Sequence, residues 1–338
     1  MVQSDSSTKF PGFVVFLLAG HIFRLPHIRM AAMRASYQWQ LRSRTLALGT
    51  RTLVMGVVNV TPDSFFDGGK FLDPESAVAH ALRLLDEGAD ILDIGGESTR
   101  PGSPVLPDEP GSKQPVTEDE ELRRVMPVIE GILKVRPGSV ISSDTYKSGV
   151  ARRAIEAGAE IVNDVSALQW DAAMARTCGD LQCGVVLMHT RGRPTEWRDL
   201  PHASDITSLV VHDLANRAQI ALESGIKRQC IVMDPGFGFG KNFDENYPLL
   251  ANLGRLQKLG FPLLAGTSRK SFIGRTVGRR RGEEAVGPGE RLYGSLAATV
   301  ASILHGAHIV RVHDVAPAVE AAAVADEVLK ASAQFKAP

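Results

Sequence analysis

The sequence is poor in cysteine. Three cysteines, Cys178, Cys183 and Cys230, occur among its 338 residues. Their number is odd, and their spacing matches neither a CxxC pair nor a zinc-binding pattern, which argues against a disulfide framework and against a zinc centre. We therefore expect a protein of a reducing compartment and predict a cytoplasmic location.

The chain also lacks an excess of charge of either sign. Lysine and arginine together number 38, as do aspartate and glutamate, so the formal net charge is zero. No global field favours nucleic acid or an anionic membrane surface, and an anion site must be local. We predict small-molecule substrates and neither nucleic acid nor membrane as a partner.

An apolar run near the N-terminus, residues 10–20, is too short to span a bilayer and is interrupted by Pro11 and Gly12. It has two interpretations. One is a weak signal peptide, and the other is a disordered or wrongly annotated leader, with translation starting at Met30 or Met33. We favour the leader, because nothing downstream has the character of an exported protein, and assign it residues 1–36.

Common ligand motifs are missing as well. Residues 236–241 (GFGFGK) fit neither the GxGxxG fingerprint nor a Walker A loop, so we expect a mobile glycine loop that approaches a ligand closely. Residues 278–282 (GRRRG) are predicted to form a solvated loop. His189 has no recognisable nucleophile beside it.

A regular alternation of strands and helices begins at Leu53. Eight short apolar segments, each predicted to be a strand, cover residues 53–60, 91–94, 140–143, 160–162, 185–188, 230–233, 263–266 and 309–310. Helices are expected between them. One starts at Asp73-Pro74, one at a Thr117–Glu120 capping box, and others cover residues 206–223, 295–305 and 316–333. This order predicts a (β/α)₈ TIM barrel in a single domain, residues 37–338, in preference to an open doubly wound sheet.

Polar residues follow most of these strands, and a barrel gathers its strand ends at one mouth. The residues brought together in this way are Asn59, Thr99, Asp144, Asn163, Met188, Asp234, Lys270, Arg311 and His313. Each alone has a simpler interpretation. Asp144 could cap the helix at Tyr146, for example, and Asp234 could be a turn residue. Their common position at strand ends favours a shared site.

The residue types divide this predicted site into two halves. Asp144, Asn163 and Asp234 supply acceptors and one amide, which suits a flat heterocycle that presents an amino group beside a ring N–H. The other half, Asn59, Arg311 and His313, is directed at an anion or a metal. Asn59 as an oxygen ligand would suit Mg²⁺ shared with a substrate phosphate.

The motifs, in their order along the chain, resemble those of bacterial dihydropteroate synthases, a family of pterin-binding enzymes. The matching stretches are residues 55–65 (MGVVNVTPDSF), 93–102 (DIGGESTRPG), 143–147 (SDTYK), 162–165 (VNDV), 188–192 (MHTRG), 233–240 (MDPGFGFG), 266–274 (GTSRKSFIG) and 310–314 (VRVHD). The resemblance covers the chain from about Trp39 onward. Two segments depart from it, the N-terminal leader and a Pro/Gly-rich expansion at residues 106–114.

This resemblance implies a reaction and a role for each residue. The reaction condenses 6-hydroxymethyl-7,8-dihydropterin diphosphate with p-aminobenzoate to give 7,8-dihydropteroate and pyrophosphate, and the family is a target of sulfonamides. The implied pterin residues are Asp144, Asn163, Met188, Asp234, Gly266 and Lys270. Those for the diphosphate are Asn59, Thr99, Arg311, Val312 and His313, with Asn59 holding Mg²⁺. Those for p-aminobenzoate are Phe65, Thr99, Arg100, Pro101 and Ser271, and the catalytic ones are Asn59, Lys270, Arg311 and His313.

The resemblance also implies a homodimer. Diphosphate departure would leave a delocalised pterin cation, so catalysis would consist of neutralising the leaving group and positioning the amine, without a protein nucleophile. Two alternatives remain. A pterin-dependent methyltransferase would share Asp144, Asn163 and Asp234 but has no use for a diphosphate clamp, and a non-catalytic pterin-binding paralogue would keep the pocket without Asn59, Lys270 or the Arg311/His313 pair.

Overall fold

Eight parallel strands form the centre of the molecule. The computed structural model describes residues 13–18, 21–26, 34–61, 73–105 and 114–334. The strands are β5 (Leu53–Asn59), β6 (Ile91–Gly95), β7 (Ile141–Asp144), β8 (Ile161–Asp164), β9 (Gly184–Met188), β10 (Ile231–Asp234), β11 (Leu264–Ala265) and β12 (Ile309–Val312). Their order is β10-β9-β8-β7-β6-β5-β12-β11, and a bridge between Met233 and Leu263 joins the two ends. The predicted (β/α)₈ barrel is confirmed.

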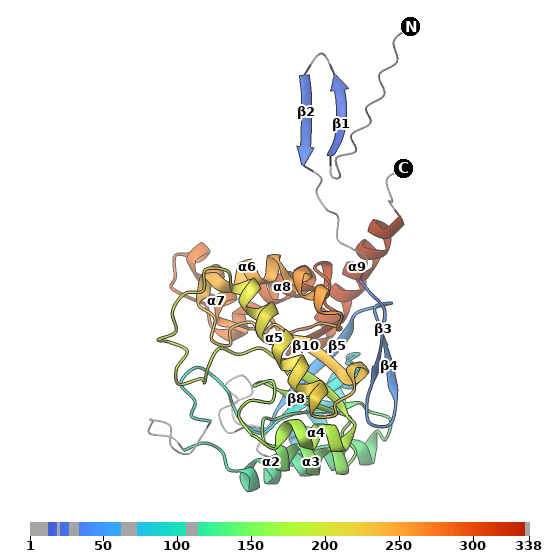
Figure 1. Ribbon diagram of the computed structural model, residues 1–338. Helices are drawn as coiled ribbons and strands as arrows, with labels where there is room; N and C mark the ends of the chain where they lie inside the picture. Colours follow the sequence, from blue (N-terminus) through green and yellow to red (C-terminus); the bar gives the residue numbers. More distant parts are fainter. Residues whose placement is uncertain (1–12, 19–20, 27–33, 62–72, 106–113, 335–338) are drawn as a thin grey trace.

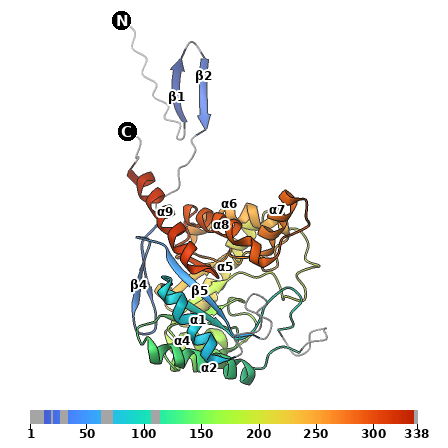
Figure 2. The same cartoon turned by 180° about the vertical axis from the view of Figure 1, so that it is seen from behind.

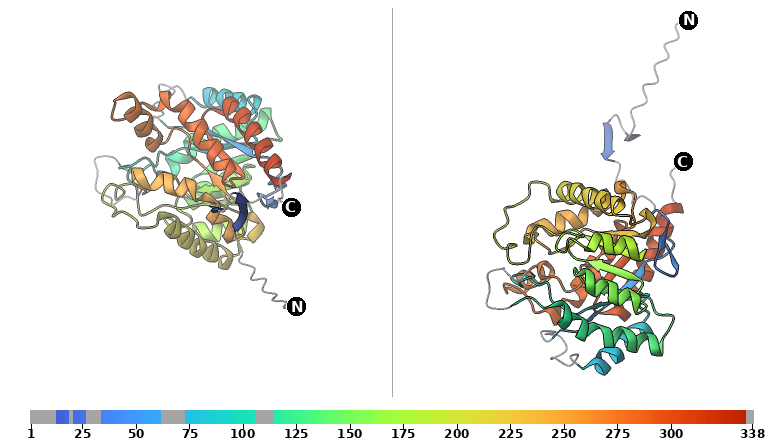
Figure 3. Two further views of the ribbon diagram at one scale, coloured as in Figure 1. Left: turned by 90° about the horizontal axis from the view of Figure 1, so that it is seen from above. Right: turned by 60° about the horizontal axis from the view of Figure 1, so that its bottom comes forward.

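Helices follow the strands and surround them (Figures 1 and 2). They are α1 (Pro74–Asp86), α2 (Glu118–Val135), α3 (Ser148–Glu156), α4 (Met174–Leu181), α5 (Ile206–Glu223), α6 (Asn246–Ala251), α7 (Ser271–Arg281), α8 (Leu292–Leu304) and α9 (Val315–Gln334). Figure 3 shows the same arrangement from two further directions. Within the described residues, none of these helices is long and apolar enough to cross a membrane.

The first turns of α1 and α2 follow the predicted capping. Asp73 accepts a hydrogen bond from the Ser76 amide at 3.0 Å, and Pro74 begins α1. Thr117 accepts one from the Glu120 amide at 3.2 Å. The Glu120 carboxylate, however, bonds Arg124 within the helix at 2.9 Å rather than completing a capping box. The start of α2 was therefore predicted correctly, but only the Thr117 hydrogen bond of the predicted capping box forms.

A short hairpin covers the amino-terminal end of the barrel. Its strands, β3 (Tyr37–Gln40) and β4 (Thr45–Leu48), pair antiparallel. Trp39 is fully buried against the first residues of the barrel strands and donates from Nε1 to the Cys230 carbonyl at 2.8 Å. The buried Glu160 accepts from the Ser43 amide at 2.8 Å and from Arg44 at 3.0 Å. This cover leaves the carboxyl-terminal end of the barrel for ligands.

The N-terminal segment contains a second hairpin, β1 (Phe13–Leu18) with β2 (His21–Pro26), which stands away from the barrel in Figures 1 and 2. The chain joins the barrel domain by Arg34, whose buried guanidinium bonds Asp326 of α9 at 3.0 Å. The assignment of residues 1–36 to a leader stays a prediction.

Two local predictions were wrong. Residues 278–281 form the last turn of α7 rather than a solvated loop, and Gly282 ends that helix with a φ of +79°. The buried Phe272 and Ile273 on the same helix decide its structure, because the arginines need only lie on the opposite face. Helix α8 begins at Leu292, not at Ser295.

Candidate functional site

A cleft of about 750 Å³ opens at the carboxyl-terminal ends of the barrel strands. Its lining includes these predicted residues: Asn59, Thr99, Arg100, Pro101, Asp144, Asn163, Met188, Asp234, Gly266, Lys270, Ser271, Arg311 and His313. Val312 is different, since its side chain packs in the core while its two neighbours in the chain, Arg311 and His313, line the cleft. Phe65 lies outside the described residues. The structure thus brings almost the whole predicted set together.

Arg311 lies between two carboxylates on the floor of the cleft. Its Nε donates to Asp93 Oδ2 at 2.6 Å, and its Nη2 donates to Asp144 Oδ2 at 2.6 Å. Burial works to lower the pKa of Arg311, but the two carboxylates outweigh it and the pKa is raised. Arg311 is therefore a permanent cation. Since a guanidinium has five N–H donors, three remain for a ligand.

The two aspartates of the predicted pterin half are unusually basic. Burial raises the pKa of Asp144 to about 7, with Arg311 opposing the shift. Burial likewise raises the pKa of Asp234 to about 6, against the effect of the Gly236 amide, which donates to Asp234 Oδ1 at 2.7 Å. Both interpretations of Asp234 therefore hold, since it is a turn residue and also lines the cleft. Carboxyl groups poised near neutrality are typical of functional sites.

Lys270 stands opposite these carboxylates at the start of α7. Its ammonium lies 4.1 Å from the centroid of the Phe239 ring, and burial, followed by Arg311, lowers its pKa to about 8. The preceding residue, Arg269, has a φ of +57°, a left-handed conformation that a non-glycine residue rarely adopts. Asp314 holds the Arg269 side chain at 2.9 Å. Backbone strain held in this way is common beside active sites.

The glycine loop after β10 is fixed by Lys241. Its buried Nζ donates to the carbonyls of Gly236 at 2.8 Å and Phe239 at 3.0 Å, and it lies 2.9 Å from His189 Nδ1. A Cβ at Gly236 would lie 2.0 Å from the His189 carbonyl, so this turn requires glycine. The loop does approach the cleft as predicted, with Gly238 in the lining. Its predicted mobility has no test in the structure.

Ser268 lies beside the ring of His313. The Ser268 hydroxyl oxygen accepts from the His313 amide at 3.2 Å and lies 3.1 Å from His313 Nδ1. The hydroxyl can donate its proton to Nδ1 or accept one from it, so this contact fits either tautomer of the imidazole. Burial, followed by Arg311, lowers the pKa of His313 well below its ordinary value. The imidazole is therefore neutral.

Asn59 is the candidate metal ligand. It ends β5, lies half-buried in the cleft wall, and its side chain bonds no other described residue. Within the described residues, no group of three or more His, Cys, Asp or Glu side chains could hold an ion. Asn59 alone would give Mg²⁺ one neutral amide oxygen and leave the rest of its shell to phosphate and water.

Sequence reasoning missed several residues that build the cleft. They are Asp93, which holds Arg311, Ser268, which orients His313, Phe239 under Lys270, and Trp197, which packs edge-on against Phe239 at 5.2 Å. Asp93 alone had a readable signal, because a carboxylate inside an otherwise apolar strand needs a buried partner. The other three depend on contacts between distant loops.

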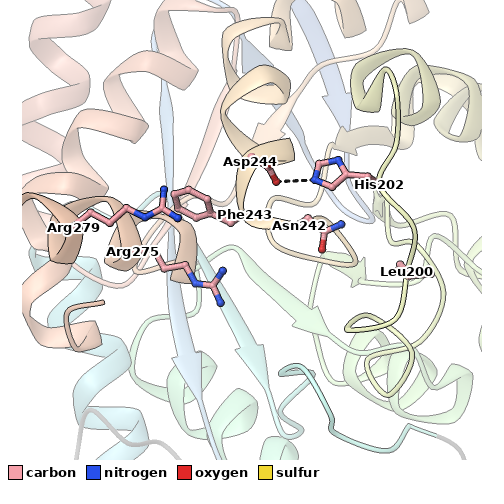
Figure 4. A pocket seen from close by; sticks show the side chains of 7 residues that line it. All are labelled: Leu200, His202, Asn242, Phe243, Asp244, Arg275 and Arg279. Atoms are coloured by element: carbon pink, nitrogen blue, oxygen red, sulfur yellow. Dashed lines mark hydrogen bonds and ion pairs between the residues drawn. The ribbon is translucent and has the colours of Figure 1, made fainter. Parts of the chain in front are cut away.

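A second hollow of about 490 Å³ lies on the outer surface. It is lined by Leu200, His202, Asn242, Phe243, Asp244, Arg275 and Arg279 (Figure 4). Arg279 lies 4.5 Å from the Phe243 ring centroid, and His202 bonds Asp244 at 2.8 Å. The His202 and Asp244 side chains are more than half exposed, so contact with water weakens the interaction between them. This hollow contains none of the predicted site residues.

Known proteins match the part of the chain that forms the barrel and the cleft. Residues 55–313 match the family described as pterin binding enzyme. The chain is 40% identical over 292 residues to a dihydropteroate synthase of Clostridium beijerinckii, which covers 86% of this chain and 99% of the relative. A structure of Xanthomonas albilineans dihydropteroate synthase with 4-aminobenzoic acid is 45% identical, with a TM-score of 0.76 over 87% of this chain and 98% of that one. The Yersinia pestis dihydropteroate synthase with a sulfonamide drug complex is 39% identical, with a TM-score of 0.78 over 87% and 99%.

Proposed function

Because this chain belongs to the family of pterin-binding enzymes, we propose that it is a dihydropteroate synthase. It condenses 6-hydroxymethyl-7,8-dihydropterin diphosphate with p-aminobenzoate, giving 7,8-dihydropteroate and pyrophosphate in folate synthesis. The observation that carries this proposal is the presence of a carboxylate/amide group and a cationic group in one cleft. Each half of the pterin diphosphate has a matching set of side chains there.

The pterin half is assigned to Asp144, Asn163 and Asp234. Asn163 Nδ2 already donates to Asp93 at 3.0 Å, so its amide oxygen is left to accept from a ligand. All three side chains then act as acceptors for the amino group and the ring N–H of a pterin. Met188 and Gly266 border the ring, and Lys270 faces it from the other side.

The diphosphate half is assigned to Arg311 and His313, with Thr99 and Asn59 on its border. Arg311 offers its remaining N–H donors, and His313 offers Nε2–H in the tautomer that we assign to it. Helix α9 begins two residues after His313 and adds the partial positive charge of its N-terminus. Asn59 would hold Mg²⁺ against the phosphates, and the ion, when bound, would neutralise part of the charge on the leaving group.

The reaction proceeds by departure of the diphosphate and attack of the amine. The C–O bond to the leaving group breaks with both electrons on oxygen, and the cation is delocalised over the pterin ring. The amine lone pair forms the new C–N bond, after which nitrogen loses a proton. Arg311 and His313 stabilise the charge that develops on the diphosphate. Arg100, Pro101 and Ser271 border the amine side of the cleft, which is also the expected sulfonamide side.

The two alternative functions fit less well. A methyltransferase has no diphosphate for the Arg311/His313 pair to bind. A paralogue that only binds pterin would have no need for Asn59 and Lys270 in the same cleft. Both would fail to release pyrophosphate. We further propose that the enzyme is a cytoplasmic homodimer, on the resemblance and the cysteine content.

Two variants test the assignment of the halves. Asp144→Ala removes an acceptor for buried ring N–H groups, which costs about 1–3 kcal/mol for each bond lost, so calorimetry should show 6-hydroxymethylpterin affinity reduced by tenfold or more. Arg311→Ala should instead lower the rate of pyrophosphate release, by about 100-fold. Unchanged pterin affinity in the first variant, or unchanged release in the second, would refute the corresponding assignment.

A further inference from the structure

Asp93 connects the two halves of the site from below. It lies in the middle of β6 between Leu92 and Ile94, is 0% exposed, and is not part of the cleft lining. A single oxygen, Oδ2, accepts from Arg311 Nε at 2.6 Å and from Asn163 Nδ2 at 3.0 Å. Arg311 belongs to the diphosphate half, and Asn163 belongs to the pterin half.

The second carboxylate oxygen of Asp93 reduces what the residue can contribute to the stability of the fold. Oδ1 is buried and has no hydrogen-bond partner among the described residues. An unsatisfied oxygen on a buried charge is costly, and a buried ion pair is weak evidence for a stabilising role, because desolvation of both charges offsets much of their attraction. This arrangement indicates that Asp93 serves something other than stability.

We propose that Asp93 is a positioning residue that orients both Arg311 and Asn163. It thereby holds the diphosphate and the pterin ring of the substrate in a fixed position relative to each other. The inference rests on the proposed function. Physically, Asp93 fixes the long guanidinium at Nε and leaves its outer nitrogens toward the cleft. It also fixes the Asn163 amide with nitrogen inward and oxygen toward the ligand, the orientation that accepts from a pterin N–H.

Two variants of Asp93 and one matched control test this role. Asp93→Asn keeps the shape and removes the charge, whereas Asp93→Leu removes both hydrogen bonds and suits an apolar strand. The control is Asp90→Asn, at the residue just before the same strand, where Asp90 also bonds an arginine, Arg51, at 2.9 Å. Each is measured for thermal midpoint, 6-hydroxymethylpterin affinity and turnover.

A positioning role predicts that function is lost in protein that is still folded. Both Asp93 variants should weaken pterin affinity by about tenfold and lower kcat by about 100-fold per folded molecule, assayed at a temperature at which each variant is still folded. Their midpoints of unfolding should fall as well, because Arg311 loses one of its two buried carboxylate partners. Asp90→Asn should leave affinity and kcat unchanged. Wild-type affinity and kcat in both Asp93 variants overturn the proposal, as does a loss of function that only follows a loss of folded protein.

Double variants show through which partner Asp93 acts. Adding Asp93→Asn to Arg311→Ala should not lower kcat further, and adding it to Asn163→Ala should not weaken pterin affinity further. Fully additive losses in both backgrounds would contradict the inference. The proposed function fails separately, if the wild-type protein releases no pyrophosphate from the two substrates, whereas pterin affinity remains measurable in that case.

Discussion

The ammonium of Lys270 lies 4.1 Å from the centroid of the Phe239 ring, and both groups line the cleft. Phe239 belongs to the glycine loop, and its carbonyl is one of the acceptors of Lys241. The loop after β10 therefore supports a site residue that comes from the next strand.

Removing the Phe239 ring should loosen Lys270. A cation–π contact is worth about 0.5–2 kcal/mol, so Phe239→Leu should weaken 6-hydroxymethylpterin binding by roughly 3- to 30-fold in calorimetry. Phe261→Leu is the matched control, because Arg228 lies 4.0 Å from the ring centroid of Phe261 away from the cleft. An equal loss of pterin affinity in both variants would contradict the role given to Phe239.

Lys241 should be a major contributor to stability. Replacing it with methionine leaves buried carbonyls of the glycine loop without a donor, each costing about 1–3 kcal/mol. We expect Lys241→Met to lower the free energy of unfolding by about 3 kcal/mol in urea titrations. Lys258→Met, at an exposed lysine, should change it by less than about 0.5 kcal/mol. A stable Lys241→Met protein would show that the loop needs no such anchor.

Pterin affinity should depend on pH through the two aspartates. The pKa values of about 7 for Asp144 and about 6 for Asp234 mean that these groups take up protons as the pH falls through that window. A protonated carboxyl no longer accepts two N–H bonds, so the contribution of the two carboxylates to affinity is full near pH 8, and affinity falls below pH 7 by about tenfold per unit for one linked proton. Calorimetry between pH 5 and pH 8.5 measures this, and a flat profile would exclude the assignment.

Metal removal should separate binding of the ring from binding of the diphosphate. A chelator should abolish turnover and weaken the pterin diphosphate by about tenfold or more, because the charge on its phosphates is then unscreened. Affinity for 6-hydroxymethylpterin, which carries no phosphate, should not change. Asn59→Ala should raise the Mg²⁺ concentration needed for half-maximal turnover. Turnover that persists in chelator would contradict a metal at Asn59.

The barrel could be predicted because its strands are short, apolar and separated by clear helix signals. Pro74 and Thr117, for instance, mark the starts of α1 and α2. The β3–β4 hairpin was not predicted, since Trp39 stands between two glutamines and the buried residues Trp39 and Leu48 find their partners only on the closed barrel.

The residues that line the cleft could be predicted from the sequence. The residues that orient them could not. Residues at strand ends, such as Asp144 and Arg311, share a position that topology alone brings together. Their orientation depends on contacts between residues far apart in the chain, such as Asp93 with Arg311 at a separation of 218 residues. Contacts of that kind form only when the barrel closes, and a local sequence pattern does not reveal them.

The most direct test mixes the purified protein with Mg²⁺, the pterin diphosphate and p-aminobenzoate, and measures pyrophosphate and 7,8-dihydropteroate in the same samples. A dihydropteroate synthase should form the two products in equal amounts, with formation of both dependent on p-aminobenzoate. Asp144→Ala and Arg311→Ala should each reduce both products in parallel. Pterin binding without either product, or pyrophosphate without dihydropteroate, would contradict the proposed condensation.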